Sequence, residues 1–239
     1  MRTSGRKNDE LRKLTFRRRY TRHAAGSVLV TAGRTVVLCT CSAELGVPNF
    51  LVGTGKGWLT AEYSMLPGST SPRKARDRSG KVDGRSVEIQ RLIGRSLRAS
   101  IDLSKLGERT LYLDCDVLDA DGGTRTAAIN GAFVALIDAL VQSKVAPETV
   151  IKDSVAAISV GLLNDVELLD LEYSEDKDAE VDMNLVMTGH GQFIEVQGTG
   201  EESTFSRSQL DRLLKIGKLG IDRITEKQRE TLGADWPLD

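Results

Sequence analysis

The stretch DADGGTRTAAINGAFVALIDAL, residues 119–140, most constrains the fold because it places two glycines between an alternating segment and a long apolar segment. Glycines let the backbone adopt conformations forbidden to other residues and approach a ligand closely. Thr124 or Thr126 would cap the apolar helix and leave its first N–H groups free beside Arg125. Such a helix start binds oxyanions, and an arginine beside it suits phosphate. An ordinary strand-to-helix turn with a solvated arginine is the alternative interpretation.

Alternation of apolar and polar residues predicts strands on both sides of this helix. The segment GSVLVTAGRTVVLCTCSAE predicts a hairpin that turns at residues 32–34, and LYLDCDVLDADGG predicts a further strand. A second hairpin turns at Asn164-Asp165, and EVDMNLVMTGHGQFIEVQG continues the sheet. The last helix begins with a capping box of Ser206 and Gln209. Hairpins followed by helices, twice over, predict a duplicated α+β unit packed as a single domain over residues 1–239.

The charges nearly cancel but are segregated along the chain. There are 33 Lys+Arg against 34 Asp+Glu in 239 residues, for a net charge of -1, and 40% hydrophobic residues can supply a full core. Residues 2–22 and 73–98 are basic, whereas residues 165–182 are dominated by acids. This asymmetry permits a polyanion on one surface and a metal ion on another. Solvated charge on separate faces is the alternative.

Cysteine and histidine usage limits the compartment and the metal. Three cysteines without a C-x-x-C pair indicate a reducing compartment and no disulfide framework. Two histidines make a zinc site a poor expectation. By inspection no apolar run reaches the roughly 18 residues that span a bilayer. Asp9 and Glu10 interrupt the arginine-rich start, which argues against a transit peptide. We therefore expect a cytoplasmic protein with no membrane partner.

The central part of the chain carries a basic loop and an arginine-rich helix. Gly55-Lys56 suggests a phosphate-binding P-loop, but the next residue is Gly57 and not serine or threonine, which excludes that motif. The segment PRKARDRSGKVDG, residues 72–84, is basic and has no apolar anchor. It leads into a predicted helix with Arg85 in its first turn. Three arginines share one stripe of that helix, which indicates a solvated or interface face more often than a nucleic-acid ridge; they are Arg91, Arg95 and Arg98.

Acidic residues gather before one of the strands of the second half. In the strand from Val181, alternation turns Asp182 away from the apolar face. A carboxylate at a strand start, beside another from the preceding loop, can hold Mg²⁺ or act as a general acid. Glu175, Asp178 and Glu180 are interpreted as turn residues. Asp114 and Asp116 share a face of an earlier strand. Two interpretations of this pair remain open: the two acids bind a metal ion, or they are buried partners of nearby arginines.

Together these parts suit chemistry on a phosphodiester. The basic loop, arginines at two helix starts, the glycine-rich turn and the carboxylates supply anion binding and acid chemistry. Nothing supplies a side-chain nucleophile, because histidines are scarce and the cysteines lie in strands. If the glycine-rich turn binds free phosphate, that phosphate is the nucleophile. Metal-dependent hydrolysis of a phosphodiester would use similar parts.

Several longer blocks resemble the ribonuclease PH family of bacterial RNA 3′-end phosphorolases, from the start of the chain to the final helix. The blocks are GKGWLTAEYSMLP, GRSVEIQRLIGRSLR, LDCDVLDADGGTRTA, AEVDMNLVMTG and EVQGTGE. The resemblance implies the family's fold, a duplicated hairpin and helix unit of the ribosomal protein S-five domain-two-like type. It also implies a homo-hexameric ring, built as a trimer of dimers.

The resemblance assigns roles to individual residues. The attacking phosphate would be bound by Arg85, Gly123, Thr124 and Arg125. Asp176 and Asp182 match the family's active-site acids, which imply Mg²⁺ binding or proton transfer. Arg73 and Arg76 lie in the family's RNA-binding loop. One departure is Gly68, where the family commonly has arginine after MLP, so one RNA contact is missing unless Lys74 or Arg78 replaces it.

The implied activity is phosphate-dependent 3′-to-5′ exoribonuclease action, with Mg²⁺ as cofactor and inorganic phosphate as co-substrate. It would trim 3′ extensions of precursor tRNA and of other RNA, ribosomal RNA included. It releases nucleoside 5′-diphosphates, and it runs in reverse as nucleotide addition. The alternative is a catalytically silent RNA-binding ring subunit of the same fold. Asp182 together with Arg85 and Arg125 argues against that alternative, since a silent subunit does not need all three.

Overall fold

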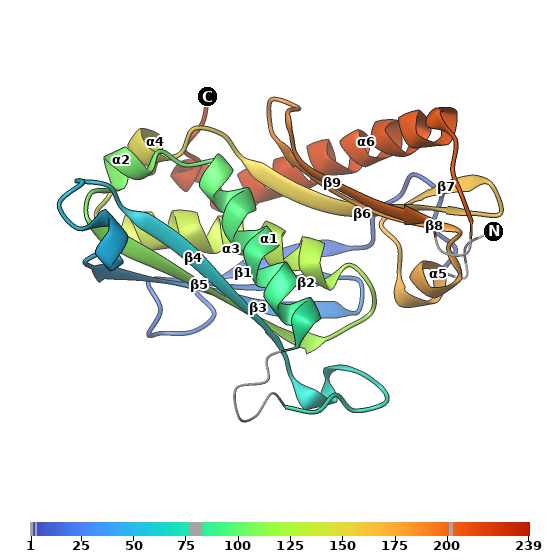
Figure 1. Ribbon diagram of the computed structural model, residues 1–239, viewed down its shortest axis with the longest axis horizontal. Coiled ribbons are helices and arrows are strands. Elements are labelled where there is room, and N and C mark those ends of the chain that lie inside the picture. Colours follow the sequence, from blue (N-terminus) through green and yellow to red (C-terminus); the bar gives the residue numbers. More distant parts are fainter. Residues whose placement is uncertain (1, 3, 77–82, 201–202) are drawn as a thin grey trace.

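The computed structural model describes residue 2 and residues 4–76, 83–200 and 203–239. Two mixed layers of helix and sheet lie side by side, one built from the first half of the chain and one from the second (Figure 1). This is the repeated α+β arrangement that the sequence predicts. The single-domain boundary over residues 1–239 stays a prediction.

The first sheet has five strands in the order β1-β2-β3-β5-β4. Its β2–β3 hairpin turns at Gly33-Arg34, as expected, and β4 pairs with β5 in parallel. The outer strands are therefore β1 and β4. The strands are β1 (Leu14–Arg18), β2 (Gly26–Ala32), β3 (Thr35–Leu45), β4 (Trp58–Met65) and β5 (Arg109–Asp119).

The second sheet has four strands in the order β7-β6-β8-β9, all antiparallel. The predicted hairpin at Asn164-Asp165 is confirmed, and both residues have positive φ, 52° and 57°. Adjacent left-handed residues make the tight turn that fits the twist of a hairpin. The strands are β6 (Val155–Leu163), β7 (Val166–Leu169), β8 (Val181–Thr188) and β9 (Phe193–Gly200).

Three long helices cover the sheets, α1 (Gly84–Ala99), α3 (Thr124–Gln142) and α6 (Arg207–Leu232). Helix α3 contacts both sheets, whereas α6 packs on the second sheet. The predicted capping box of α6 is present, with both hydrogen bonds between Ser206 and Gln209. The short elements are α2 (Leu103–Leu106), α4 (Pro147–Val150), α5 (Tyr173–Asp178) and the 3-10 turns η1 (Asn49–Leu51), η2 (Pro67–Ser69) and η3 (Gly233–Asp235).

Helix α3 is more apolar than the sequence inspection indicated. Among the described residues, its 19-residue span is the one helix long and apolar enough to cross a membrane, with a mean hydropathy of 1.3. The expectation that no apolar run reaches that length was therefore wrong by this measure. Inside the protein 89% of that window is buried, which is the position of a core helix. Its apolar character is explained by packing against two sheets.

The strand alternation read from the sequence is confirmed in both layers. Cys39 and Cys41 are fully buried beneath α3 in the larger cluster of core residues. In β8 one face packs into the smaller cluster with α6; its residues are Val181, Met183, Leu185 and Met187. Asp182 lies on the opposite face, as predicted.

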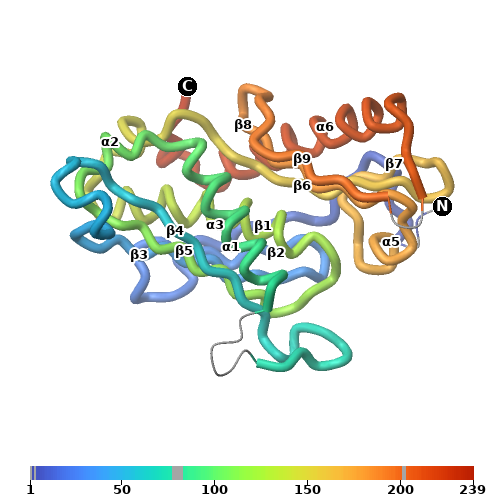
Figure 2. The backbone as a smooth tube through the Cα atoms, viewed as in Figure 1, coloured from blue at the N-terminus to red at the C-terminus, as the bar shows by residue number. Residues whose placement is uncertain are grey.

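Some arginines near the N-terminus are bound into the fold, whereas others of this basic run, such as Arg17 and Arg19, are exposed as a solvated run would be. Arg18 pairs with Asp138 on α3 and Asp235 near the C-terminus. Arg2 pairs with the buried Glu175 of α5. Figure 2 shows the N-terminal segment running beside β7 and α5. Long-range pairs of this kind leave no periodic signal in the sequence.

Candidate active site

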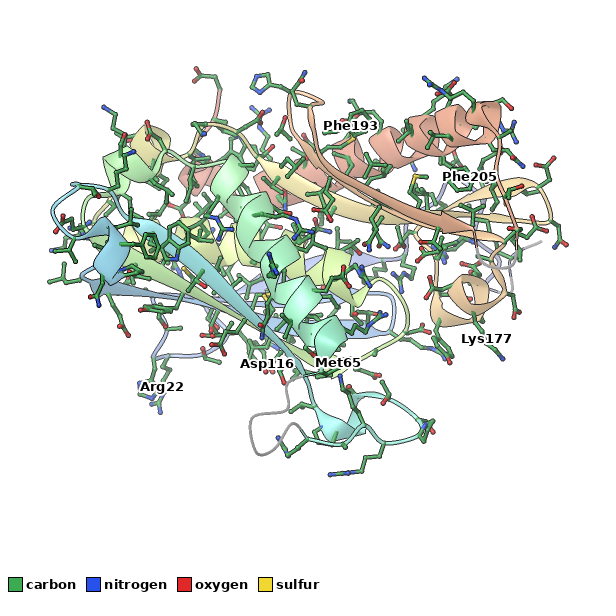
Figure 3. All side chains as sticks on the ribbon, in the orientation of Figure 1. Arg22, Met65, Asp116, Lys177, Phe193 and Phe205 are labelled. Atoms are coloured by element: carbon green, nitrogen blue, oxygen red, sulfur yellow. The ribbon has the colours of Figure 1, made fainter. Side chains whose placement is uncertain are left out.

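The largest described cavity, about 950 Å³, lies where the two layers meet at one end of α1 and α3. In Figure 3 the labelled Met65 marks the end of β4 on one side, and the labelled Lys177 marks α5 on the other. Four predicted site residues line this cavity: Arg85, Gly123, Thr124 and Asp176. The other lining residues are Arg34, Met65, Gly68, Ser69, Thr70, Ser71, Pro72, Lys74, Asp119, Ala120, Asp121, Gly122 and Tyr173.

The glycine-rich turn forms the floor of this cavity. Gly122 and Gly123 have φ values of 74° and 62°, in the left-handed region that favours glycine. Gly123 is the N-cap of α3. The prediction that a threonine side chain caps the helix is wrong, because Thr126 Oγ1 donates to the Gly123 carbonyl and Thr124 Oγ1 accepts from Tyr63. The first N–H groups of α3 have no acceptor within the helix, which makes them donors for an anion.

Tyr63 supports this helix start from below. Its hydroxyl donates to Thr124 Oγ1 at 2.8 Å, and its ring is 2% exposed. Burial raises the Tyr63 pKa above its ordinary value, although the Thr124 hydrogen bond and the nearby charges of Arg85 and Arg125 lower it. The phenol is therefore neutral and keeps its proton as a donor at neutral pH.

The acid-bearing helix α5 packs directly against the glycine-rich turn. A Cβ atom on Gly122 would lie 2.7 Å from the Leu171 carbonyl oxygen and 2.9 Å from Tyr173 N. The Tyr173 N–H also donates to Asp121 Oδ1 at 3.4 Å. This close approach brings Asp176 of α5 into the lining of the cavity that Arg85 also lines.

Glu175 anchors α5 from the other side and is not a turn residue. Arg2 donates to both Glu175 carboxylate oxygens at 2.6 Å, and Glu175 is 5% exposed. Burial is the largest single influence on the Glu175 pKa and raises it, but the hydrogen bonds from Arg2 and from the Glu172 N–H, together with the charges of Arg2 and Arg6, hold that pKa below its ordinary value. Two neighbouring acids therefore have different roles: Glu175 anchors α5 to Arg2, and Asp176 lines the cavity. The spacing of the acids in the sequence does not reveal this difference.

Arg85 stands at the mouth of the cavity in the first turn of α1. Its side chain is exposed, and its backbone N–H donates to the N-cap Asp83 at 3.3 Å. Lys74 Nζ contacts Asp83 Oδ2 at 2.7 Å, and this hydrogen bond is the largest cause that holds the Asp83 pKa below its usual range. Two cations thus converge on one rim of the cavity, Arg85 and Lys74.

Arg125 does not line this cavity. Its Nη1 lies 3.2 Å from Glu88 Oε1 and donates to Gln197 Oε1 at 2.7 Å. Gln197 pairs directly with Asn184 across β8 and β9, so its side chain shares a sheet face with Asn184 and with Asp182. Arg125 and Asp182 therefore belong to a separate group around Gln197. This group adjoins the cavity, because Arg125 follows the lining residue Thr124 directly in α3.

The described residues contain no group of three or more His, Cys, Asp or Glu placed to hold a metal ion. A hard cation at this site would take only one or two carboxylates from the protein. Mg²⁺ is usually bound in that way, through one or two carboxylates together with substrate phosphates and waters. The residues present thus fit Mg²⁺ that is bound with phosphate.

Two further clusters raised by the sequence lie outside this cavity. Among the described residues neither Asp114 nor Asp116 forms an ion pair. Burial is the main cause that raises the pKa of both acids, and the negative charge of Glu62 raises both further. The arginine stripe of α1 is partly engaged within the chain, where Arg95 pairs with Glu195 and Arg98 donates to the Leu59 carbonyl at 3.0 Å.

Comparison with known proteins identifies the family. Residues 10–142 match the 3′ exoribonuclease family, domain 1, and residues 153–220 match domain 2 of the same family. The chain belongs to the ribonuclease PH family of 3′ exoribonucleases. Ribonuclease PH from Bacillus velezensis is 57% identical over 242 residues, which cover 99% of each chain. Ribonuclease PH from Rhodopirellula baltica is 56% identical, over 96% of each chain.

Solved structures at lower identity share the fold. Rice (Oryza sativa) Rrp46 has a TM-score of 0.78 at 21% identity, covering 97% of this chain and 100% of that chain. The Archaeoglobus fulgidus exosome with RNA bound to the active site gives a TM-score of 0.79 at 21% identity, over 95% and 92% of the chains. The resemblance read from the sequence motifs is confirmed, and so is the ribonuclease PH-type fold.

Membership at this identity makes the chain a phosphate-dependent 3′ exoribonuclease. Within this ribonuclease PH-type site, the loop residues Arg73 and Arg76 are exposed beside the lining residue Lys74. Arg78, considered as a replacement for the missing arginine at Gly68, lies outside the described residues. Arg34 and Tyr173 were missed by sequence reasoning, because a hairpin-turn arginine and a tyrosine at a short helix start carry no motif.

Proposed function

We propose that this ribonuclease PH family member trims the 3′ ends of precursor tRNA and other RNA, with phosphate bound by Arg85, Gly123, Thr124 and Arg125. One observation carries the proposal: a single cavity joins backbone donors at the start of α3, the Arg85 guanidinium and the Asp176 carboxylate. No histidine or cysteine lines that cavity among the described residues. The cavity therefore offers no thiol or imidazole as a nucleophile, and in this proposal the attacking group is phosphate from solution.

The chemistry balances with these groups. A phosphate oxygen forms a bond to the phosphorus of the terminal phosphodiester, and the bond from that phosphorus to the 3′-oxygen of the preceding nucleotide breaks. The leaving 3′-oxygen takes up the proton that the attacking hydrogen phosphate loses when the new bond forms, and Asp176 or Asp182 would relay that proton. The products are a nucleoside 5′-diphosphate and an RNA shorter by one nucleotide. Arg85, Arg125 and the backbone N–H groups neutralise negative charge that builds up on the phosphoryl oxygens.

We propose Mg²⁺ as the cofactor, held by Asp176 and Asp182 together with phosphate. When bound, the ion would neutralise charge on the phosphate oxygens and orient them. Asp176 lines the cavity, and Asp182 lies in the adjoining group around Gln197. The two carboxylates belong to different elements, α5 and β8.

A catalytically silent RNA-binding subunit is the alternative that the sequence leaves open. It is not favoured, because the relatives that match over nearly the whole chain are ribonuclease PH enzymes. A hydrolytic nuclease would release nucleoside monophosphates without added phosphate, which makes product identity the deciding measurement.

We expect 3′-extended precursor tRNA to yield nucleoside 5′-diphosphates when phosphate is present and nothing when phosphate is left out. Phosphate is the nucleophile in this mechanism, so its removal stops the reaction. Chromatography of the released nucleotides from parallel incubations measures this. Monophosphates released in phosphate-free buffer would identify a hydrolase.

We propose that the protein acts in the cytoplasm as a homo-hexamer, a trimer of dimers. Large exposed apolar side chains at one end of the first sheet support association; they are Leu45, Phe50 and Val52, at 86%, 67% and 64% exposed. Such side chains cost free energy when they face water. A ring would bring several basic loops, each with Arg73 and Arg76, to the RNA.

Light scattering of the purified protein should therefore report six times the 26.0 kDa chain mass. Apolar contacts at the exposed end of the first sheet would hold the copies together. Replacing Phe50 by a charged residue should shift the mass towards smaller species, whereas the same change at the exposed Tyr173, on α5, should not. A fully active monomer would remove the ring from the mechanism.

A further inference from the structure

Arg12 lies beneath the phosphate site without reaching its cavity. It follows the N-terminal segment just before β1, and its side chain is 4% exposed. It is not among the residues that line the 950 Å³ cavity. A buried arginine directly behind an anion site needs a role other than direct contact with the anion.

Two sets of contacts fix Arg12 between the layers. On one side, Asp170 at the end of β7 accepts from the Arg12 backbone N–H at 2.8 Å, from Nε at 3.1 Å and from Nη2 at 2.7 Å. On the other side, Nη1 donates to the Asp121 carbonyl at 2.6 Å and contacts the Gly122 carbonyl at 3.4 Å. One guanidinium therefore joins the glycine-rich turn to the segment that enters α5.

These contacts determine where the backbone donors of the turn point. In a trans peptide the C=O and the following N–H point in opposite directions. Because the carbonyls of Asp121 and Gly122 face Arg12, the N–H groups of Gly122 and Gly123 face away from it. Gly122 and Gly123 both line the cavity. A Cβ atom on Gly123 would lie 2.8 Å from Arg12 Nη2, so the guanidinium is packed directly under the turn.

Thr35 acts on the same turn from β3. Its hydroxyl donates to the Gly122 carbonyl at 2.7 Å and accepts from the Asp121 N–H at 2.9 Å. Thr35 is fully buried. Two side chains, Arg12 from the segment before β1 and Thr35 from β3, thus contact the Gly122 carbonyl, and both contacts would have to break before the peptide could rotate.

We infer that Arg12 is a positioning residue for phosphate, which orients the N–H donors of the glycine-rich turn and fixes that turn against the Asp170–Tyr173 segment leading to Asp176. The inference rests on the proposed function, in which this turn binds the attacking phosphate. Loss of the guanidinium fork weakens phosphate binding, and RNA binding by the exposed loop arginines stays as it was. The signature is a change in the phosphate dependence and not in RNA affinity.

Arg12→Lys keeps a positive charge beside Asp170 but cannot donate to Asp170 and the Asp121 carbonyl in the same fork. Phosphorolysis of 3′-extended tRNA by the full-length protein is measured at saturating RNA while phosphate is titrated. We expect a rise of about tenfold in half-saturating phosphate and an unchanged RNA dissociation constant. A loss of maximal rate or melting temperature at unchanged half-saturating phosphate would show a structural role only and overturn the inference.

Thr35→Val provides a second variant should Arg12→Lys fold poorly. It is nearly isosteric and removes both hydrogen bonds to the turn, so half-saturating phosphate should rise at least threefold. Thr110→Val is the matched control, because the buried Thr110 donates to the Gly46 carbonyl at 2.8 Å on a different loop. It should leave the phosphate titration unchanged. Equal shifts in the two threonine variants would overturn the inference.

Arg85→Gln, at a residue proposed to contact phosphate, separates this inference from the proposed function. If Arg85→Gln raises half-saturating phosphate and neither Arg12→Lys nor Thr35→Val does, the phosphate site stands and the positioning role is wrong. If none of the three variants alters the phosphate titration, the proposed phosphate site itself is wrong and the inference falls with it.

Discussion

Asp182→Asn should nearly abolish turnover in both directions while RNA still binds. Asparagine keeps the size of the side chain but loses its charge and its ability to exchange a proton. General acid catalysis alone is worth about 10²- to 10⁴-fold in rate, and a weakened Mg²⁺ site adds to the loss. Asp182 is half-buried and lies on the face of β8 opposite the smaller core cluster, and asparagine has nearly the same volume, so the change should leave packing intact.

Glu180→Gln is the control for this variant. Glu180 is exposed, one residue before β8, and its carboxylate accepts from the Asp165 N–H at 3.5 Å in the β6–β7 turn and not in the group around Gln197. Initial rates of phosphorolysis and of nucleotide addition are measured for both variants beside an RNA-binding curve. Near-normal rates for Asp182→Asn would refute its catalytic role. Equal losses in both variants would instead indicate a general disturbance of the acidic segment.

Local patterns were sufficient to predict the strands, the hairpins and the last helix. The turn at Asn164-Asp165 and the capping box of Ser206 depend on residues close in sequence, and both are present. The geometry of such turns and caps is determined by a few consecutive residues, since their hydrogen bonds join neighbours along the chain. The pairing of five strands and four strands into two sheets depends on long-range contacts, which alternation does not specify.

The charged residues were harder to place, because an ion pair between distant residues leaves no periodic trace. Arg18 belongs to a basic run in the sequence, yet it joins Asp138 of α3 to Asp235 in the fold. Glu175 belongs to an acidic run, yet it binds Arg2. Burying such a charge is tolerated only with a partner and good hydrogen bonds. Which charges are buried was therefore decided by tertiary packing.

Four of the predicted site residues share one cavity, but the sequence did not predict the contacts that they make. Arg85, Gly123, Thr124 and Asp176 come together on one cavity as the motifs imply. Thr124 nevertheless bonds Tyr63 and does not cap α3, because Gly123 in the left-handed region takes the N-cap position. The supporting contacts of Arg12, before β1, and of Thr35, on β3, reach the glycine-rich turn from far away in the sequence, and no motif in either segment predicts them.

Gly122→Ala should remove most of the activity, because the added methyl group disrupts the contact between the glycine-rich turn and α5. The new methyl group would lie 2.7 Å from the Leu171 carbonyl oxygen and 2.9 Å from Tyr173 N, both backbone atoms that cannot swing away. The φ of 74° adds a strain of about 1–3 kcal/mol for a residue with a side chain. Relief of the clash requires the turn and α5 to separate, which moves Asp176 from the phosphate donors. We expect maximal phosphorolysis to fall by at least about 10²-fold, since misplacement by about 1 Å can cost that much.

Gly53→Ala is the matched control, because it separates backbone strain from the lost juxtaposition. Gly53 has nearly the same φ, 76°, but nothing lies within 4 Å of an added Cβ, and it does not line the cavity. Both variants are compared for melting temperature, RNA binding and phosphate titration. Gly53→Ala should lose stability comparable to the strain and keep its maximal rate. A Gly122→Ala protein with a normal rate would show that the close packing of the turn on α5 is not needed to hold Asp176 beside the phosphate site. If the two variants lost activity equally, strain alone would account for the effect, and the contact between the turn and α5 would have no separate part in catalysis.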